Sequence, residues 1–501
     1  MDDNILGKVK VLTQMLSVGR ANDYNLWREV GLCLHNLSDE LLDNWKEFSR
    51  KSLNYKDGEC EKMWSQMGFE RDVKISLLIL NRWAQIDNLD EYIKIVGISP
   101  RPPPDVARTV FSLYKYQYIC TSIKRGIWYE FRNHRWSQNS YSFLEKIGHN
   151  VIHEYDRLIA YYSRLSLDQP TVIRKIYQEI IKNLNNVVAK LGTPKFVNNI
   201  MKECECLFYD SQFESKLNNN RDLVGFENGI YDLRIGGLRP GRQEDYISLS
   251  TGHNYVEFAE NHEYVSAIET FMYQVFLDKT VKDYIYILLS SFLEGHNPNE
   301  KFHIFRGDGS NGQTSLLELV RLALGGYMTL FPVSFLTHRQ KRSGLVEIEA
   351  SRLKDSRLLV VSNGCDRAEK LNVTILKEWT GGDRISGLGS DGVAIDYKPQ
   401  FKIVYQCHYW PRLPVDDEGV WRRVSLVEFE SRFVENPDPQ NPYEFKRDAG
   451  FGLKLDLWKQ TFMFMLIEKY KIYRKHGLIE PTTVINATKE YRQYLKANPN
   501  D

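Results

Sequence analysis

The chain has 501 residues, a length that one hydrophobic core rarely organises, and it therefore predicts two to four domains. Apolar residues make up 42% and charged residues 26%, which excludes a mainly disordered, collagenous or coiled-coil chain. Lys and Arg number 66 against 65 acidic residues, so a globally basic coat for nucleic acid is excluded, and any such site must be a local patch.

The seven cysteines are too scattered for a disulfide framework. Only Cys204 and Cys206 lie close together, and without a second pair they favour a structural role over metal binding. The first ten residues lack the apolar core of a secretory signal, and the apolar runs are too short to span a bilayer. These features predict a reduced, intracellular, soluble protein.

Helical periodicity dominates residues 1–98, where four of the ten Trp fall, and predicts a helical N-terminal domain. Residues 99–104 read Ser-Pro-Arg-Pro-Pro-Pro, which fits neither helix nor central strand and predicts a linker. A mixed α/β domain is predicted over 105–264. Its hairpin-like alternation, its helical periodicity and its strand-and-turn segment occupy 121–136, 141–205 and 226–255.

The pattern becomes α/β over residues 265–434, where short apolar strands alternate with helical or polar stretches. The predicted strands are FHIF (302–305), RLLVVS (357–362), FKIVYQC (401–407) and RVSLVEF (423–429). Residues 435–501 open with a proline cluster and continue as a helical C-terminal segment. The predicted fold class is therefore multidomain, α+β and α/β.

A glycine-rich loop between a predicted strand and a predicted helix is the most informative segment. Such a loop can wrap a phosphate with its backbone N–H groups, at the positive end of the helix. The candidate nucleotide-binding residues are Gly307, Asp308, Gly309, Ser310, Asn311, Gly312, Gln313 and Thr314. Thr314 stands where a Mg²⁺-ligating hydroxyl belongs, whereas Gln313 stands where the loop lysine is expected. The alternative is a polar loop that opens an ordinary helix.

Five ordered segments resemble the superfamily 3 helicases, in particular the primase–helicases of large DNA viruses, phages and mobile elements. They are RGDGSNGQTS, LKDSRLLVVSNGCDRAEKLN, LKEWTGGDRIS, QFKIVYQCHYWPRLP and DDEGVWRRVSLVEF. Upstream, LWREVGLCLHN is similar to the small helical domain that follows the primase in such proteins, and FENGIYDL to the domain before their helicase. The resemblance implies a P-loop, AAA+-like ATPase domain over 265–434.

The family resemblance also implies an oligomeric ring, usually a hexamer, with ATP and Mg²⁺ at subunit interfaces and a DNA strand in the channel. Ser362 and Asn363 then take the place of the second Walker motif, and His408 that of the sensor. Arg422 and Arg423 match the pair from which an arginine finger reaches the neighbour's γ-phosphate.

Three departures from the family pattern fall on catalytic positions. Gln313, Asn363 and His408 replace the expected Lys, acid and Asn. Phosphoryl transfer depends on charge placed around the γ-phosphate and the metal, so we expect weak or absent ATP hydrolysis in a DNA-binding scaffold. An active helicase that uses non-standard residues is the alternative, and a subunit that binds nucleotide without turnover is a third. Nearby Arg306 and Asp366 are interpreted as solvated rather than as substitutes.

Local basic residues are the candidates for DNA contact, because a ring multiplies a few cations along the phosphate backbone. They are Arg339, Lys341, Arg342 and Lys398, the last at the end of a pore hairpin that the resemblance places at 384–398. Cations and aromatics also interleave over 124–136, although core rings are the favoured interpretation there.

The expected partners are single-stranded or forked DNA, other copies in a hexameric ring and a primase domain in cis or in trans. A catalytically intact paralogue is a further candidate, because a retained finger arginine would serve such a neighbour in a mixed ring. No membrane is expected. The resemblance places the protein inside the cell at viral or mobile-element replication sites, as a fragment of a longer primase–helicase or a shortened relative.

Overall fold

A computed structural model describes most of the chain and divides it into two compact units. The described residues are 3–67, 79–81, 83–84, 86–88, 91–92, 106–139, 141–167, 171–337, 353–362, 368–388 and 394–498. One unit comprises Met1–Tyr116 and Leu144–Leu207, and the other comprises Gln117–Phe143 and Phe208–Asp501. The stretch 105–264, which the sequence predicted as one mixed domain, is thus divided between the two units.

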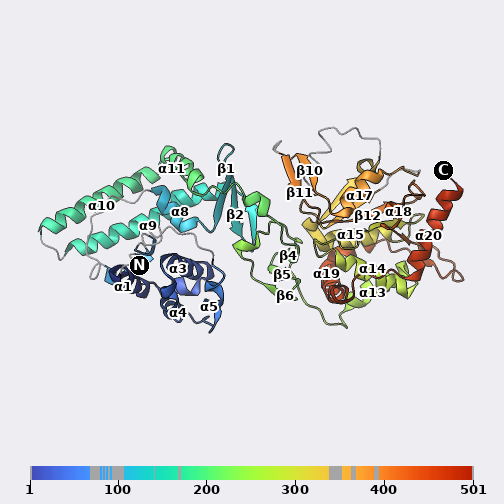
Figure 1. Cartoon of the computed structure of the whole chain (residues 1–501), viewed down its shortest axis with the longest axis horizontal. Coiled ribbons are helices and arrows are strands. Elements are labelled where there is room, and N and C mark those ends of the chain that lie inside the picture. Colours follow the sequence, from blue (N-terminus) through green and yellow to red (C-terminus); the bar gives the residue numbers. More distant parts are fainter. Residues whose placement is uncertain are drawn as a thin grey trace. The chain divides into compact units, whose positions relative to one another are not determined.

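The first unit is helical in its described part (Figure 1). Its helices are α1 (Asp3–Gln14), α2 (Val18–Asn22), α3 (Tyr24–Leu37), α4 (Leu42–Ser49), α5 (Glu59–Trp64), α8 (Val106–Tyr114), α9 (Tyr141–Leu167), α10 (Thr171–Leu191) and α11 (Pro194–Leu207). Trp27 stacks on Trp45 with ring centroids 4.7 Å apart. Gly31 makes this packing possible, because an added Cβ would lie 2.3 Å from the Trp45 ring. The predicted helical character of the N-terminal region is confirmed there.

Two small antiparallel sheets belong to the second unit. The first contains β1 (Tyr118–Ser122), β2 (Ile127–Arg132) and β3 (Arg135–Gln138), and the second contains β4 (Leu223–Phe226), β5 (Gly229–Asp232) and β6 (Gly237–Arg239). The predicted hairpin is confirmed. Trp128 and Trp136 are 0% and 2% exposed, so these rings are core residues and offer no stacking platform for bases.

The central sheet has five parallel strands in the order β13-β7-β12-β9-β8. They are β7 (Phe302–Arg306), β8 (Met328–Pro332), β9 (Leu358–Ser362), β12 (Lys402–Cys407) and β13 (Val424–Glu428). Four were predicted from their apolar runs. Alternate residues of β9 enter two different cores, Leu358 and Val360 on one face and Leu359 and Val361 on the other. Burial on both faces explains the nearly continuous apolar strands.

Helices cover both faces of this sheet (Figure 1). Side chains of α13 (Glu263–Val275), α14 (Lys279–Ser291), α15 (Gln313–Leu324) and α19 (Phe451–His476) pack on one face. Side chains of α17 (Val373–Gly381) and α18 (Glu418–Trp421) pack on the other. Along the edge strand β13 lies α20 (Thr482–Ala497), whose Thr488 Oγ1 accepts a hydrogen bond from Leu426 N at 2.9 Å. The predicted helical C-terminal segment is confirmed in its described residues.

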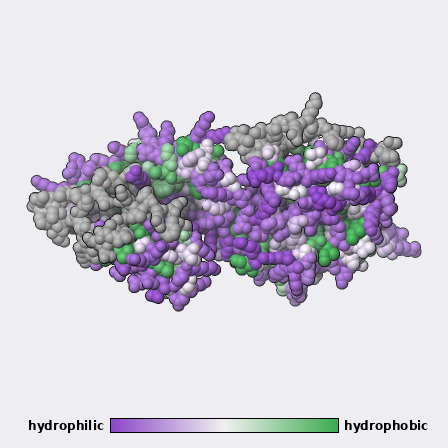
Figure 2. All heavy atoms as spheres, viewed as in Figure 1, coloured by the Kyte–Doolittle hydropathy of each residue, from purple (hydrophilic) through white to green (hydrophobic). Residues whose placement is uncertain are grey.

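The remaining short elements are divided between the two units, with Asp39–Leu41 in the first and the others in the second. They are α12 (Phe213–Lys216), β10 (Ile385–Leu388), β11 (Ala394–Tyr397), β14 (Arg432–Val434), β15 (Glu444–Lys446) and the 3-10 helices Asp39–Leu41, Gln243–Asp245, Gly325–Tyr327 and Val333–Leu336. Among the described residues, no helix combines the length and apolarity needed to cross a membrane. Hydrophilic side chains predominate on the face shown in Figure 2, where apolar ones are scattered.

Candidate functional site

The glycine-rich loop joins β7 to α15 at the carboxyl edge of the central sheet. Gly309 and Gly312 have φ angles of 91° and 85°, and Ser310 has a φ of 50°, so the loop curls through the left-handed region. Gly307 has no room for a side chain, because an added Cβ would lie 1.9 Å from Nδ2 of Asn311. The loop therefore has the predicted strand–loop–helix context, with its backbone wrapped at the start of a helix.

The side chain of Gln313 points back into the sheet rather than toward the loop. Gln313 is 2% exposed, and its Nε2 donates to the carbonyl of Phe305, on β7, at 2.6 Å. Its backbone N–H donates a hydrogen bond to Asn311 Oδ1 at 3.2 Å. The position expected to carry a cationic phosphate ligand thus carries a neutral side chain whose donor is already engaged.

Thr314 lies beside a polar residue of β12 that the sequence reasoning missed. Gln406 Nε2 donates to Thr314 Oγ1 at 3.1 Å, and Gln406 is paired with Ser362 across the parallel β9–β12 ladder. β12 buries every side chain except that of Gln406, which is half-buried. The available signal was an amide side chain next to the carboxyl end of a strand that is otherwise apolar after Lys402. The exposed Ser362 and the half-buried Gln406 therefore lie on the same side of the loop as Thr314.

His408 forms a hydrogen bond with the backbone of the loop. Its Nδ1 lies 2.7 Å from the carbonyl oxygen of Gly307, and because that oxygen only accepts, Nδ1 carries the proton. The ring also borders Gly309, since Cε1 lies 3.8 Å from a Cβ built there. His408 therefore contacts the glycine-rich loop, and its role as the sensor stays a prediction. Asn363, the other half of the predicted pair with Ser362, lies outside the described residues.

Arg306, which ends β7, is half-buried and engaged on several sides, unlike the solvated residue the sequence suggested. It donates to Asp308 Oδ1 at 3.0 Å and to Glu428 Oε2 at 3.3 Å, and it lies 5.4 Å from the Trp410 ring centroid. Burial raises the pKa of Glu428, although the Arg306 charge opposes that rise. Arg306 is thus held between two acids, one of which, Asp308, belongs to the loop itself.

Arg422 and Arg423 precede β13 and so lie at the amino edge of the sheet, opposite the loop. Both contact Glu300 Oε2, at 2.7 and 2.9 Å. Arg423 also donates to Thr380 Oγ1 at 3.1 Å and to Gly419 O at 2.6 Å, and only 11% of its side chain is exposed. Among the described residues, Arg422 pairs with Glu300 alone, and its side chain is 57% exposed. It is therefore the arginine more able to leave Glu300.

The predicted pore hairpin consists of β10 and β11, which pair in antiparallel fashion. Lys398 follows β11 and is exposed, whereas Arg384, before β10, is ion-paired with Asp396. The other candidate DNA ligands, Arg339, Lys341 and Arg342, lie outside the described residues. Lys398 is therefore the one of the four predicted basic residues whose placement the structure gives.

Asp222, Glu294 and His296 bring potential ligand atoms within 4.8 Å of one another. Glu294 is 9% exposed, and its two oxygens accept from the hydroxyls of Tyr470 and Tyr473 at 2.8 and 3.0 Å. Asp222 Oδ1 lies 3.2 Å from His296 Nε2. Because the Glu294 oxygens are already engaged, we interpret the group as a structural hydrogen-bond network.

Two buried cations lie beside this network, and sequence reasoning did not identify either. Arg357 is 2% exposed and donates to the carbonyls of Leu293, Leu223 and Asn220, the last two at 2.7 and 3.2 Å. Lys402 is 4% exposed and donates to two carbonyls at and beyond the end of α14. These residues join the amino ends of β9 and β12 to α14 and to the second small sheet.

The chain matches two family models. The model described as "D5 N terminal like" matches residues 107–281, and the model described as "Primase C terminal 2 (PriCT-2)" matches residues 9–84. Both matched segments precede the glycine-rich loop in the sequence.

The chain is also similar in sequence to several viral proteins and in part to a solved structure. A putative helicase of Acanthamoeba polyphaga mimivirus is 33% identical over 516 residues, which cover 98% of this chain and 53% of the viral protein. A putative primase of African swine fever virus is 22% identical over 468 residues, which cover 86% of this chain and 48% of that protein. The chain thus spans about half the length of these relatives. An apo structure of the NrS-1 C-terminal region is 13% identical, covers 48% of this chain and 55% of that one, and has a TM-score of 0.33, too low to support an argument.

Proposed function

The chain belongs to the primase–helicase family of large DNA viruses, and we propose that it acts as a ring-forming P-loop module that binds single-stranded DNA and hydrolyses ATP weakly or not at all. The observation that carries this proposal is the buried, neutral Gln313, whose Nε2 donates to Phe305 O at 2.6 Å. A loop without a cation near the β- and γ-phosphates lacks one of the charges on which phosphoryl transfer depends. The module would work at viral replication sites inside the host cell.

ATP and Mg²⁺ are the proposed ligands of the loop 307–314. The loop backbone would hold the phosphates, and Thr314 Oγ1 would contribute to holding the metal, which supplies positive charge to the γ-phosphate. Loss of one preorganised electrostatic group costs about 10²–10³ in rate. The losses at Gln313, Asn363 and His408 need not multiply, because such groups act as a unit.

A ring is supported by the position of Arg422. The five residues of β13, about 17 Å long, separate the amino edge that carries Arg422 from the carboxyl edge that carries the loop. Arg422 therefore cannot serve the loop of its own chain, but it is exposed to meet that of a neighbour. A hexamer, or a ring mixed with an intact paralogue, would use it, and a primase domain in cis or in trans would complete the assembly.

DNA would pass through the ring along the β10–β11 hairpin and Lys398, with Arg339, Lys341 and Arg342 as further phosphate ligands. Few cations per subunit are needed, because the ring repeats them along the strand. This arrangement agrees with a net charge of only +1.

Phosphate release from ATP should stay at the level of a Thr314→Ala, Arg422→Ala control, with or without single-stranded DNA. The physical reason is the absence of a loop cation and of the Walker acid. The measurement is a coupled phosphate assay on the 501-residue chain, alongside measurements of single-stranded DNA binding and of native mass. Turnover that rises with DNA and disappears in the control would contradict the scaffold function.

That contradicting outcome would favour the second candidate, an active superfamily 3 helicase with non-standard residues. The hydrogen bond between Gln406 Nε2 and Thr314 Oγ1, at 3.1 Å, favours it, because an ordered hydroxyl at the metal position is retained. Gln406 would then be the residue to replace next.

Gln313→Lys should tighten ATP binding about tenfold or more. A lysine charge left unpaired in the buried site of Gln313 would be costly, so the side chain should turn toward the phosphates of a bound nucleotide. A hydrogen bond between two charged groups is stronger than one between neutral groups. The measurement is titration with a non-hydrolysable ATP analogue and Mg²⁺. Gln313→Met is the matched control, because it breaks the bond to Phe305 O without adding charge. Equal affinities for the two variants would contradict this role of the position.

A further inference from the structure

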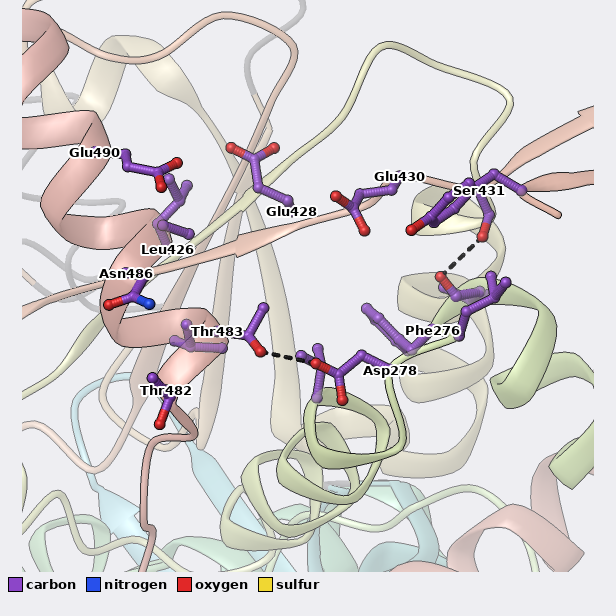
Figure 3. Close-up of a pocket in the computed structure, with 16 residues that line it drawn as sticks. Phe276, Asp278, Leu426, Glu428, Glu430, Ser431, Thr482, Thr483, Asn486 and Glu490 are labelled. Carbon is purple, nitrogen blue, oxygen red and sulfur yellow. Dashed lines mark hydrogen bonds between the residues drawn. The ribbon is translucent and has the colours of Figure 1, made fainter. Parts of the chain in front are cut away.

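Charge is unevenly distributed along the chain. Residues 174–202 include six Lys and Arg but a single acid, Glu179, so this segment has a net charge of +5 while the whole chain has +1. Acids gather elsewhere. Around the cavity in Figure 3 lie Glu428, Glu430 and Glu490, and no Lys, Arg or His belongs to its described lining. A near-zero net charge thus conceals a local basic segment, which raises the potential around it.

The basic segment lies on α10 and α11 in the first unit (Figure 1). Arg174 donates to the carbonyls of Ser166 and Leu167 at 3.2 and 3.1 Å, so it is engaged at the end of α9. The other five cations are exposed lysines, and in the described part of the chain none makes an ion pair or a side-chain hydrogen bond. These five residues form the basic face and are Lys175, Lys182, Lys190, Lys195 and Lys202.

Three lysines of the basic face form a row along α10. Lys175, Lys182 and Lys190 are separated by seven and eight residues. Because two turns of an α-helix contain about 7.2 residues, they project from one side of it, over about 22 Å. The exposed Asn186 lies between the last two lysines, and Glu179 lies between the first two. The backbone of the row is rigid, because it follows a single helix of 21 residues.

The basic face continues on α11. Lys190 Nζ lies 6.0 Å from the Phe196 ring centroid, which joins the end of α10 to the start of α11. Lys195 and Lys202 are again seven residues apart, and the exposed Asn199 follows Lys195 by one turn. Ammonium and amide groups therefore alternate over both helices, and both are donors that contact phosphate oxygens in nucleic acids.

Another helix of the chain carries lysines that are neutralised locally. On α19 three lysines pair with nearby acids, as Lys454–Asp448, Lys459–Asp456 and Lys471–Glu468, at 2.6 to 2.8 Å. Mixed charges of this kind solvate a surface without a strong field, whereas a face of one sign attracts an anionic partner. The basic face therefore has the charge pattern of a binding surface rather than that of an ordinary solvated helix.

The side chains around the basic face favour a double-stranded nucleic acid over other anions. Described large apolar side chains from 174 to 202 are buried or half-buried, so none is presented to a lipid surface. The two rings in this segment, Tyr177 and Phe196, are buried and half-buried, whereas single strands are bound by stacking on accessible rings. A straight row of lysines instead matches a stiff duplex, which holds its phosphates at fixed positions.

We propose that the basic face is a second nucleic-acid site, which binds the phosphate backbone of a DNA duplex without sequence preference. The lysines would displace counterions from the duplex, and the amides would donate further hydrogen bonds to phosphate. This inference does not rest on the glycine-rich loop or on the single-strand site proposed at Lys398. It assigns duplex DNA to the first unit, so that the protein could hold the duplex and the single strand of one substrate at once.

The test is binding of a blunt-ended DNA duplex to the 501-residue chain, measured by fluorescence anisotropy at several salt concentrations. A Lys182→Gln, Lys190→Gln, Lys202→Gln variant should bind the duplex at least about tenfold more weakly than wild type at about 0.1 M salt, because it loses three phosphate contacts. The slope of log affinity against log salt concentration should become shallower by about two to three.

The matched control is a Lys454→Gln, Lys459→Gln, Lys471→Gln variant, which removes the same charge from lysines that are paired with acids. It should keep the wild-type affinity and slope. A single strand of the same length is the second ligand, and both variants should bind it as wild type does.

Equal duplex affinities for the two variants, or no duplex binding by wild type, would overturn the inference. So would an equal loss of single-strand binding in the first variant, because the lysines would then serve any nucleic-acid strand. Vesicles that contain phosphatidylserine are a further comparison, and lysine-dependent binding to vesicles but not to duplex would replace the duplex by a membrane. Absence of single-strand binding in all three proteins, with the duplex results as expected, would contradict only the proposed function.

Discussion

Replacing Arg357 by methionine is expected to lower the free energy of unfolding of the second unit by about 3 kcal/mol, because each buried acceptor that loses its donor costs about 1–3 kcal/mol and removal of the buried charge offsets part of that cost. The guanidinium donates to the carbonyls of Leu293, Leu223 and Asn220 and lies 4.9 Å from the Tyr327 ring centroid. Methionine fills similar space but leaves three buried acceptors without their donor, and unsatisfied buried groups are costly.

Amide hydrogen exchange of β9 and β12 in urea is the appropriate measurement, because it reports on the second unit without interference from the first. Arg321→Met provides the control. Its guanidinium is 43% exposed and pairs with Glu318 one helical turn away, so its loss should change exchange little. Equal protection in the two variants would contradict the anchoring role of Arg357.

Four of the five strands of the central sheet could be predicted from the sequence, because burial on both faces gives them continuous apolar runs, whereas the partly exposed β8 has no such run. Residues 357–362 and 401–407 are examples, and both form the predicted strands. The glycine loop was visible as a strand–loop–helix pattern, although the family resemblance of the surrounding segments was needed to favour a phosphate loop over an ordinary polar loop. Local composition therefore indicated the position of the candidate site.

The orientation of Gln313 and the burial of two cations depend on long-range contacts, which the sequence did not indicate. Gln313 could be recognised as a missing lysine, but its bond to Phe305 O depends on where β7 ends relative to α15. Arg357 and Lys402 each lie at the start of an apolar strand, where a cation ordinarily stays in water, and contacts from segments distant in sequence bury them.

The boundary of the predicted mixed domain depends on long-range packing in the same way. Cys204 on α11 is fully buried, and its Sγ lies 3.9 Å from Ala107 O on α8, almost one hundred residues earlier in the chain. Helices from 144–207 thus join the N-terminal unit although strands lie between them in sequence. Periodicity identified those helices, but no local pattern could state which core they would enter.

The stability of the second unit should rise with pH between about 7 and 8.5, and Lys402→Met should remove that rise. Burial lowers the pKa of Lys402 from 10.5 to about 7 in the folded chain. In this window the unfolded chain keeps the proton that the folded chain has released, so unfolding becomes less favourable as pH rises. Below pH 7 both states are protonated, and the full penalty of the buried charge, roughly 5 kcal/mol, applies.

The difference in stability between wild type and Lys402→Met, measured across pH, isolates this contribution from other titrating groups. His303→Gln is the matched control. Burial lowers the pKa of His303 to about 3, so its contribution is lost only as pH falls below 6.5, where the unfolded histidine gains a proton. Wild type and His303→Gln should therefore share the rise above pH 7 and differ below pH 6.5. A rise that persists in Lys402→Met would mean that Lys402 stays charged in the fold, held by its two carbonyl acceptors.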